Sequence, residues 1–403
     1  MSSQRGTRII DRLRRIFGAI LVPPGLSFDF FPGGAVGYLG YELADQLDRI
    51  SFRRKSGPRS PKLELLFFRD LVVYDHKEEK YFLLSWIIPR KGISFEKARA
   101  QAEANLAEME RLLLGEDPAS SPNGHFELIR FRPEISKPAF ERMVRKAKEY
   151  IRAGDIYQAN LSQRFSFEFK GSPPHLYGRL RVTNPAPFSA ALRFGNLFIA
   201  SSSPELLVQK KGRLCVTSPI AGTRPRGWTA LESRRLAREL FQSEKERAEH
   251  LMLVDLERND LGRVSEWRSV RVRDFMRLEK YARVQHIVSE ITSRLCPGKD
   301  VWDVVRAMFP GGTITGCPKI RSMQIIDELE PVERGIYTGS IGWIGFNGDT
   351  MLNIAIRTLV LQKNRGWLQV GAGIVADSDP AREYEETLAK GEALLEALVE
   401  AST

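Results

Sequence analysis

The sequence predicts an α+β protein in which helices cover antiparallel sheets. Many segments alternate apolar and polar residues with the period of a β-strand, and no internal repeat relates them. Helical patterns around residues 230–253 and 318–328 interrupt these segments without the regular alternation of a βαβ protein. We therefore expect strands that pair mainly with antiparallel neighbours.

The N-terminal part, residues 1–115, is predicted to be a strand-rich subdomain. ELLFFRDLVVYD and KYFLLSWII have the composition of strands, and a charged helix follows over residues 94–114. The segment LLLGEDPASSPNGHF ends that helix with a glycine, two prolines and small polar residues. Such a segment is typical of a linker, so we expect a boundary there.

Residues 125–403 are predicted to pack as one globular unit. The unit begins with the helical segment PAFERMVRKAKEYIRAG, which Gly154 ends. Alternating segments follow it along the chain, including IYQANLSQRFSFEF, SAALRFGNLFIASSS, LLVQKKGRLCVTS, YTGSIGWIGF, NIAIRTLVLQ and GWLQVGAGIV.

The composition is that of a folded protein without a membrane segment. The chain has 403 residues, of which 42% are hydrophobic and 28% are charged, so it can bury a large core. No apolar run approaches the roughly 18 residues that a membrane helix needs. The arginine-rich N-terminus lacks a small-residue cleavage site, and the three cysteines, Cys215, Cys296 and Cys317, are too scattered for a disulfide scaffold. We expect a cytoplasmic protein.

The positive charge fits three kinds of partner. A net charge of +11 with a pI near 9.6 fits nucleic-acid binding, an anionic small substrate or an acidic partner subunit. Only RRKSGPRSPK, over residues 53–62, forms a dense basic cluster, and no base-stacking motif accompanies it. The sequence therefore favours the small substrate or the acidic subunit, and we expect no nucleic-acid partner.

The C-terminal helix DSDPAREYEETLAKGEALLEAL carries charges beside its apolar face. Glu383, Glu386 and Lys390 recur at spacings of three and four residues, which stacks them along one stripe. One interpretation is a solvated edge with an ion pair between Glu386 and Lys390. The other is a pocket, because the preceding VGAGIVADSDP is a strand that runs through small residues directly into the helix.

Two further stretches predict anion and metal binding. In TSPIAGTRPRG, Gly222 lets the backbone approach a ligand, and its amide with Thr223 suits a carboxylate, although an ordinary turn has the same pattern. In KERAEHLMLVDLERNDLGRV, Glu249 lies among residues of a buried helix side, where an unpaired carboxylate is costly. Glu249 is thus a candidate to share an ion with Glu386 and Glu383, and oxygen ligands alone suit Mg²⁺.

Two later stretches leave their alternatives open. FPGGTITGCPKIRSMQIIDELEP contains a helix start that suits an anion, but tight packing is the favoured interpretation for Lys319 and Arg321. In GIYTGSIGWIGFNGDTMLNIAIRTLV, Tyr337 and Arg357 are predicted on neighbouring strands of one hairpin. A buried Arg357 requires an anionic partner, which is either a substrate carboxylate or an internal acid.

Taken together, these stretches resemble the chorismate-utilising enzymes. The resemblance runs from about Phe31 to the C-terminus, and its specific motifs occur in the family's order: PIAGTRPRG, AEHLMLVDLERNDLGRV, VQHIVSEI, FPGGTITGCPKIRSMQIIDELEP, YTGSIGWIGFNGD and GAGIVADSDPAREYEETLAK. It implies a four-layer fold, with two packed antiparallel sheets flanked by helices. It also implies that the first strands of the family are absent or replaced, so we expect no tryptophan feedback.

The resemblance assigns roles to the residues already singled out. It implies that Glu249 and Glu386 bind Mg²⁺ directly, that Glu383 acts through water, and that the ion holds the ring carboxylate of chorismate. The remaining substrate-binding positions divide between the ring carboxylate and the enolpyruvyl side: Gly222 and Thr223 for the former, and Tyr337, Arg357, Gly371, Gly373 and Lys390 for the latter.

Four positions match the reacting centre of the family. Glu205 matches the acid that protonates the leaving 4-hydroxyl, and His286 the residue that supports charge on the ring. Gln158 stands where water-using relatives have a lysine base, so ammonia is the expected nucleophile, delivered by a glutamine amidotransferase subunit. Ala221 stands where enzymes of the aminodeoxychorismate branch have a lysine, whereas the packing segments resemble that branch more than the anthranilate branch. The resemblance therefore favours aminodeoxychorismate as the product and leaves anthranilate open.

Overall fold

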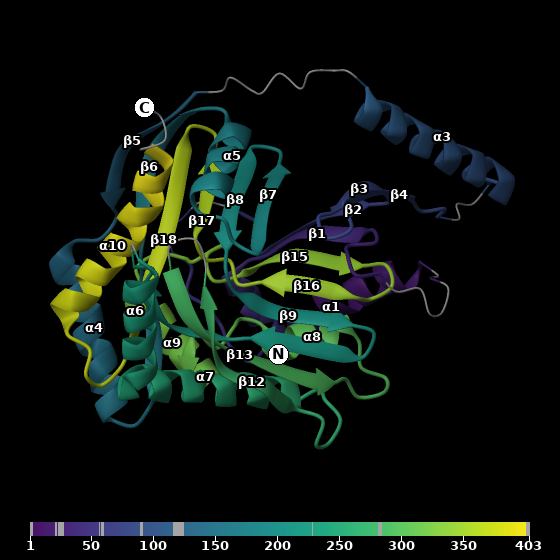
Figure 1. Ribbon diagram of the computed structural model, residues 1–403. Coiled ribbons are helices and arrows are strands. Elements are labelled where there is room, and N and C mark those ends of the chain that lie inside the picture. Colours follow the sequence, from purple (N-terminus) through teal and green to yellow (C-terminus); the bar gives the residue numbers. More distant parts are fainter. Residues whose placement is uncertain are drawn as a thin grey trace.

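The computed structural model describes residues 3–20, 22, 28–55, 57, 60–88, 92–115, 125–227, 229–280 and 284–399 (Figure 1). The predicted linker over 116–124 lies outside the described residues, and the division at residue 115 stays a prediction. β1, from the N-terminal side of that division, nevertheless pairs with β15 from the C-terminal side, residue by residue from Gly34↔Gly345 to Leu39↔Ser340.

Two large antiparallel sheets dominate the described part of the chain. The nine-stranded sheet has the order β11 (Ile220–Pro225), β13 (Val284–Arg294), β10 (Leu214–Ser218), β9 (Leu206–Lys211), β16 (Thr350–Asn353), β15 (Ser340–Gly345), β1 (Gly34–Leu39) and β2 (Leu63–Phe68), with β12 (Arg271–Lys280) also on β13. The seven-stranded sheet has the order β14 (Gly316–Cys317), β6 (Gln158–Gly171), β18 (Arg365–Ile374), β17 (Thr358–Gln362), β8 (Leu197–Ser203) and β7 (Phe188–Phe194), with β5 (Phe126–Pro133) also on β6. A separate hairpin pairs β3 (Asp70–Asp75) with β4 (Lys80–Ser85).

The helices cover the outer faces of these sheets (Figure 1). On the seven-stranded sheet lie α4 (Lys137–Arg152), α5 (Pro173–Thr183) and α10 (Pro380–Val399); on the nine-stranded sheet lie α1 (Ser3–Gly18), α2 (Ala44–Leu47), α7 (Glu244–Gly262) and α8 (Val301–Met308). The others are η1 (Tyr41–Leu43), α3 (Phe95–Leu114), α6 (Ala230–Gln242) and α9 (Lys319–Leu329). No helix in the described ranges is both long and apolar enough to cross a membrane.

The core lies in layers that follow this arrangement. A cluster between the two sheets includes Tyr38 of β1, Ile199 of β8 and Ile341 of β15. A second cluster joins the nine-stranded sheet to its helices, and a third joins the seven-stranded sheet to α5 and α10. The predicted α+β class and the four layers implied by the resemblance are therefore confirmed.

Local sequence signals set the ends of the site-bearing helices. Ser243 caps α7 by accepting the backbone N–H of Glu246 at 3.3 Å. Asp379 precedes Pro380 and accepts the N–H groups of Ala381 and Arg382, at 3.1 and 2.9 Å, which starts α10. α10 buries Tyr384, Leu394 and Leu395, as its apolar pattern predicted.

The N-terminal helix was not predicted from the sequence, and neither were α5 and α8. The arginine-rich N-terminus forms α1, which packs Ile10, Leu13 and Phe17 into the core of the nine-stranded sheet. Their spacings of three and four residues are the helical signal that identifies this segment.

Candidate active site

Two adjacent strands of the seven-stranded sheet form the floor of the site. β6 and β18 pair antiparallel, with Gly373 opposite Asn160 and Gly371 opposite Ser162. Side chains alternate along a strand, so Gln158 and Asn160 project to the same face of β6. An ideal Cβ at Gly373 would lie 2.5 Å from Gln158 Nε2 and 3.4 Å from Glu249 Oε1. The glycine therefore leaves room for these polar groups to meet over the strand.

Carboxylates from α7 and α10 come together near the end of these strands. Gln158 Nε2 donates to Glu249 Oε1 at 3.2 Å, which joins β6 to α7. Burial raises the pKa of Glu249, and the negative charges of Glu246 and Glu386 raise it further. Burial likewise raises the pKa of Glu383, with Glu386 again adding to the effect. The structure thus brings the three predicted metal ligands near one another, across α7 and α10.

Lys390 connects α10 to the glycine strand. Its Nζ donates to the carbonyl oxygen of Gly371 at 3.1 Å and lies 2.7 Å from Glu386 Oε1. The predicted ion pair of the solvated-edge interpretation is therefore present, on a helix that also faces the site. No group of three or more His, Cys, Asp or Glu side chains within the described ranges is arranged to hold a metal ion. The magnesium site stays a prediction.

A second group of predicted residues meets where β11, β13 and the start of β9 come together. Burial raises the pKa of Glu205 to about 7, against the opposing effects of the Thr313 hydroxyl, the Ile220 amide and the Arg357 charge. Burial and then the Arg357 charge lower the pKa of His286 to about 4. At pH 7 the Glu205 carboxyl is therefore about half protonated and the His286 imidazole is neutral, and the positive charge of Arg357 acts on both.

A bulge in β11 shapes the turn that carries Ala221 and Gly222. The register between β11 and β13 shifts between Ala221 and Thr223, and Gly222 takes a φ of +63° there. An ideal Cβ on Gly222 would also lie 2.8 Å from Leu240 and 2.9 Å from Glu246 Oε2, so a larger residue would have to displace the ends of both side chains and adopt a strained backbone conformation. His286 Nδ1 lies 3.4 Å from the Gly222 carbonyl oxygen. The Thr223 side chain lies outside what the structure describes.

The prediction that Tyr337 and Arg357 lie on neighbouring strands of one hairpin was wrong. Tyr337 precedes β15, whereas Arg357 lies between β16 and β17, where the chain passes from one large sheet to the other. The apolar run was read as one continuous strand, but it divides between two sheets. Arg357 has a φ of +50°, a backbone conformation that is uncommon for residues other than glycine. Its carbonyl oxygen accepts the Ser202 N–H at 3.1 Å.

A buried ion pair that the sequence did not reveal supports Tyr337. The guanidinium of Arg334 lies 5.7 Å from the Tyr337 ring centroid, 2.6 Å from Glu330 Oε1 and 2.5 Å from the carbonyl oxygen of Asn160. Burial raises the pKa of Tyr337 above its usual range, so its hydroxyl stays protonated. The i,i+4 spacing of Glu330 and Arg334 was visible in the sequence, but nothing local indicated that both are buried.

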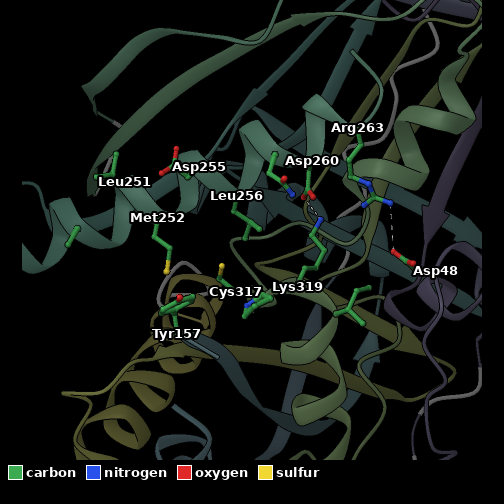
Figure 2. Close-up of a pocket in the computed structure, with 14 residues that line it drawn as sticks. Asp48, Tyr157, Leu251, Met252, Asp255, Leu256, Asp260, Arg263, Cys317 and Lys319 are labelled. Atoms are coloured by element: carbon green, nitrogen blue, oxygen red, sulfur yellow. Dashed lines mark hydrogen bonds and ion pairs between the residues drawn. The ribbon is translucent and has the colours of Figure 1, made fainter. Parts of the chain in front are cut away.

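α7 also borders a cavity of about 690 Å³ (Figure 2). Leu251, Met252 and Leu256 line it from the helix, facing Tyr157 and Cys317. Lys319 in its wall pairs with Asp260 and with the Met308 carbonyl, and Arg321 nearby pairs with Asp155. Internal pairing of Lys319 and Arg321 agrees with the favoured packing interpretation. Glu249 and the other site residues do not line this cavity.

The fold and the arrangement of these residues define an enzyme class. The chain belongs to the chorismate binding enzymes, because the model of that family matches residues 12–396. It is therefore a chorismate-utilising enzyme, as the motifs suggested.

Individual relatives come from two branches of that family. Aminodeoxychorismate synthase component 1 of Bacillus subtilis (strain 168) is 46% identical over 374 residues, which cover 92% of this chain and 78% of that protein. Anthranilate synthase component 1 of Aquifex aeolicus (strain VF5) is 44% identical over 371 residues, covering 91% and 74%. The crystal structure of anthranilate synthase component I from Streptococcus pneumoniae TIGR4 is 37% identical and superposes with a TM-score of 0.86, covering 96% of this chain and 85% of that one.

Proposed function

We propose that this chain aminates chorismate to 4-amino-4-deoxychorismate with Mg²⁺ and ammonia. The observation that carries the proposal is the environment of Glu205, a buried carboxyl beside Arg357 and the Ile220 amide whose pKa is raised to about 7. A carboxyl of this pKa holds a proton near neutral pH and can still release it, as a general acid must. Hydroxide is a poor leaving group, so loss of the 4-hydroxyl requires such an acid.

In the proposed step, the proton that Glu205 donates is replaced by one that the attacking ammonia loses. Glu205 gives its proton to the 4-oxygen as the C–O bond breaks, and the oxygen leaves as water. Ammonia forms the new C–N bond and loses one proton, which returns the acid to its starting state through solvent. The neutral imidazole of His286, with its pKa lowered to about 4, lies beside the ring without adding a second positive charge to that of Arg357.

The two carboxylates of chorismate have separate partners in this proposal. Arg357, Tyr337, Lys390 and the glycines of β18 receive the enolpyruvyl carboxylate, and the Gly222 turn receives the ring carboxylate. Donor chemistry supports a metal beside that turn, because Glu249, Glu383 and Glu386 offer oxygen ligands. Burial raises the pKa of Glu249 and of Glu383, and the negative charge of Glu386 raises both further, which favours a cation among them. Mg²⁺ held there would polarise the ring carboxylate and ease departure of the C4 oxygen.

The nature of Gln158 supports ammonia as the nucleophile. Its amide donates to Glu249 at 3.2 Å and has no basic nitrogen with which to activate water. Ammonia needs no such activation. The B. subtilis and A. aeolicus relatives are both named component 1, which supports a second component as the source of ammonia, in our proposal a glutamine amidotransferase.

Ala221 favours a second candidate, anthranilate synthesis. The resemblance implies a lysine in this turn for the aminodeoxychorismate branch, and Ala221 is a buried methyl group next to the Ile220 amide that contacts Glu205. Amination to aminodeoxychorismate in this chain would therefore proceed by direct addition of ammonia or with another group in place of the missing lysine.

Product analysis tests the proposal and separates the two candidates. The purified chain is incubated with chorismate, Mg²⁺ and an ammonium salt, with and without aminodeoxychorismate lyase, and the products are separated by chromatography. We expect 4-aminobenzoate only in the sample with lyase. Anthranilate in the sample without lyase would establish the second candidate, and turnover with glutamine as the sole nitrogen source would contradict the need for a partner.

A further inference from the structure

An ion pair joins the strand that carries the Gly222 turn to helix α7. Arg224 Nη1 donates to Glu246 Oε1 at 3.0 Å, from two residues beyond Gly222 to three residues before Glu249. The side chains of Arg224 and Glu246 are 31% and 19% exposed, so the pair is partly shielded from water. Neither residue has a role in the function proposed above.

The sheet holds the residues on both sides of Gly222 but not Gly222 itself. Ala221 pairs with Ile287 of β13 and Thr223 pairs with His286, so the bulge leaves Gly222 without a partner in that strand. The strand order of the described sheet also ends with β11, and α6 and α7 contact this strand in place of a further one. The position of the Gly222 amide therefore depends in part on contacts with these two helices.

Side chains from α6 and α7 fill the space beside this glycine. An ideal Cβ on Gly222 would lie 2.8 Å from Leu240 Cδ1 and 2.9 Å from Glu246 Oε2. Glu246 therefore binds Arg224 through one carboxylate oxygen and places the other beside Gly222. Ser243 accepts the backbone N–H of Glu246 at 3.3 Å, which fixes this end of α7. The Glu246 carboxylate thus has a firm base from which it can hold the turn.

The same carboxylate lies near the predicted metal ligands. Burial is the largest cause of the raised pKa of Glu249, and the negative charge of Glu246 is the next. An uncompensated carboxylate at this position would repel an anion that approaches the turn. Arg224 compensates the charge, so Glu246 can hold the turn with little repulsion of a carboxylate ligand.

We propose that Arg224 and Glu246 are positioning residues, which hold the Gly222 turn in the conformation that receives the ring carboxylate of chorismate. The inference rests on the proposed function, because the carboxylate is that of the proposed substrate. Neither side chain touches the substrate in this role. Glu246 acts through the backbone of the turn, and Arg224 acts through Glu246 as its anchor and its counter-charge.

Calorimetric titrations of chorismate test this role, with Mg²⁺ raised until the affinity no longer depends on it. The decisive variant is Glu246→Gln, because loss of a negative charge near the site would by itself tighten the binding of an anion. A loosened turn has the opposite effect, so we expect chorismate to bind about three- to tenfold more weakly. 4-Hydroxybenzoate, which has a ring carboxylate and no enolpyruvyl group, should lose the same factor.

Arg224→Met keeps the Glu246 charge and removes its anchor. We expect chorismate to bind about 10- to 100-fold more weakly, because the turn is loosened and an uncompensated carboxylate is left beside it. The double variant Arg224→Met and Glu246→Gln should return to the affinity of Glu246→Gln alone, since both residues act through one contact. If Arg224 bound the substrate directly, the loss seen in Arg224→Met would persist in the double variant.

Arg235→Met is the matched control. Arg235 pairs with Glu239 at 3.6 Å on the exposed side of α6, a helix that also contacts β11. The variant therefore removes a positive charge from the same region and leaves the contact between Arg224 and Glu246 in place. Its chorismate affinity should stay within about twofold of wild type. Because the pair of Arg224 and Glu246 is partly exposed, Arg224→Met and Glu246→Gln should melt within a few degrees of wild type.

Three results would contradict the proposals, in distinguishable ways. Unchanged or tighter binding of chorismate by Glu246→Gln would overturn the positioning role and leave the proposed function intact. A double variant that binds chorismate as weakly as Arg224→Met would also overturn that role, because it would show direct contact between Arg224 and the substrate. A wild-type chain that does not bind chorismate would instead overturn the function on which the inference rests.

Discussion

Gln158 Nε2 donates a hydrogen bond to Glu249 Oε1 across 3.2 Å, from the first residue of β6 to the N-terminal part of α7. The contact places a neutral donor against a buried carboxylate whose pKa is already raised by burial. Gln158 therefore places no charge beside the Glu249 carboxylate. Its replacement by a charged residue has two measurable consequences.

The first prediction concerns Gln158→Lys. An ammonium here pairs with Glu249, competes with a bound cation for that carboxylate, and introduces a group that can act as a base toward water. We expect ammonia-dependent turnover of chorismate to fall at least tenfold and hydroxylated product to appear, as measured by chromatography at fixed Mg²⁺. Gln158→Leu, which removes the donor and adds no base, should lose turnover without hydroxylated product. Unchanged amination by Gln158→Lys would contradict a role for neutrality at this position.

The second prediction concerns Glu205 as the general acid. Removal of a proton-transfer group costs roughly 10²–10⁴-fold in rate, so Glu205→Gln should lose that much in kcat with less change in KM. In the wild type, the required form is protonated, so kcat should fall as the pH rises through about 7. A Glu205→Gln variant with a wild-type pH profile would assign the acid to another group.

The same carboxyl also gives a stability prediction. Its pKa rises from 4.5 in the unfolded chain to about 7 in the folded chain, so the folded state retains a proton that the unfolded state releases. Its contribution to stability is complete below pH 4.5 and is lost as the pH rises to about 7. The free energy of unfolding of Glu205→Gln, measured in urea relative to that of the wild type, should therefore increase by on the order of 3 kcal/mol between pH 4.5 and pH 8. A pH-independent difference between the two proteins would contradict the raised pKa.

The third prediction concerns the glycine floor. Gly373→Ala places a Cβ 2.5 Å from Gln158 Nε2, the movable end of a side chain, so the amide must shift and its bond to Glu249 is broken. We expect at least a tenfold loss in kcat/KM with a change in melting temperature of only a few degrees. Gly178→Ala is the control, because it lies inside α5 with no atom within 4 Å of its new Cβ, and it should be stabilised by up to about 1 kcal/mol with unchanged activity. Equal activity of the two variants would show that the floor tolerates a methyl group.

Periodicity in the sequence predicted most of the regular elements but not their long-range relations. α10 and its charged stripe were predicted from local spacing, because the apolar residues of an amphipathic helix recur every three or four positions in the sequence. The passage of the chain between sheets at Arg357 was not predicted, because a buried apolar run has no signal for where one sheet ends and another begins. The roles of Glu205 and His286 depended on the family resemblance, since their common neighbour Arg357 is distant from both in the sequence.

Two features of the site could not be read from local sequence. They are the buried Asn160 Oδ1, which accepts no hydrogen bond within the described residues, and the buried ion pair of Arg334 and Glu330. Asn160 follows Gln158 by two residues, so strand alternation alone places both on one face. The surroundings of its Oδ1 include Gly371, where an ideal Cβ would lie 2.5 Å from that atom and which is far from Asn160 along the chain. Burial of Glu330 and Arg334 depends in the same way on the Tyr41 ring, which lies 4.8 Å from the guanidinium.

The last prediction concerns this buried pair. The side chains of Arg334 and Glu330 are each only 1% exposed, and Glu330 Oε1 also accepts from the N–H and hydroxyl of Ser162. Removal of one partner leaves an uncompensated buried charge, so Arg334→Met should lower the free energy of unfolding by about 3–5 kcal/mol in urea. Arg145→Met is the matched control, since Arg145 pairs with Glu141 at 3.4 Å on an exposed helix surface, and it should change stability by at most about 1 kcal/mol.

Because Arg334 also holds the Asn160 carbonyl and lies over Tyr337, the double variant Arg334→Met and Glu330→Leu should recover stability while chorismate affinity stays reduced. Recovery of both properties would mean that the pair stabilises the fold without positioning the site.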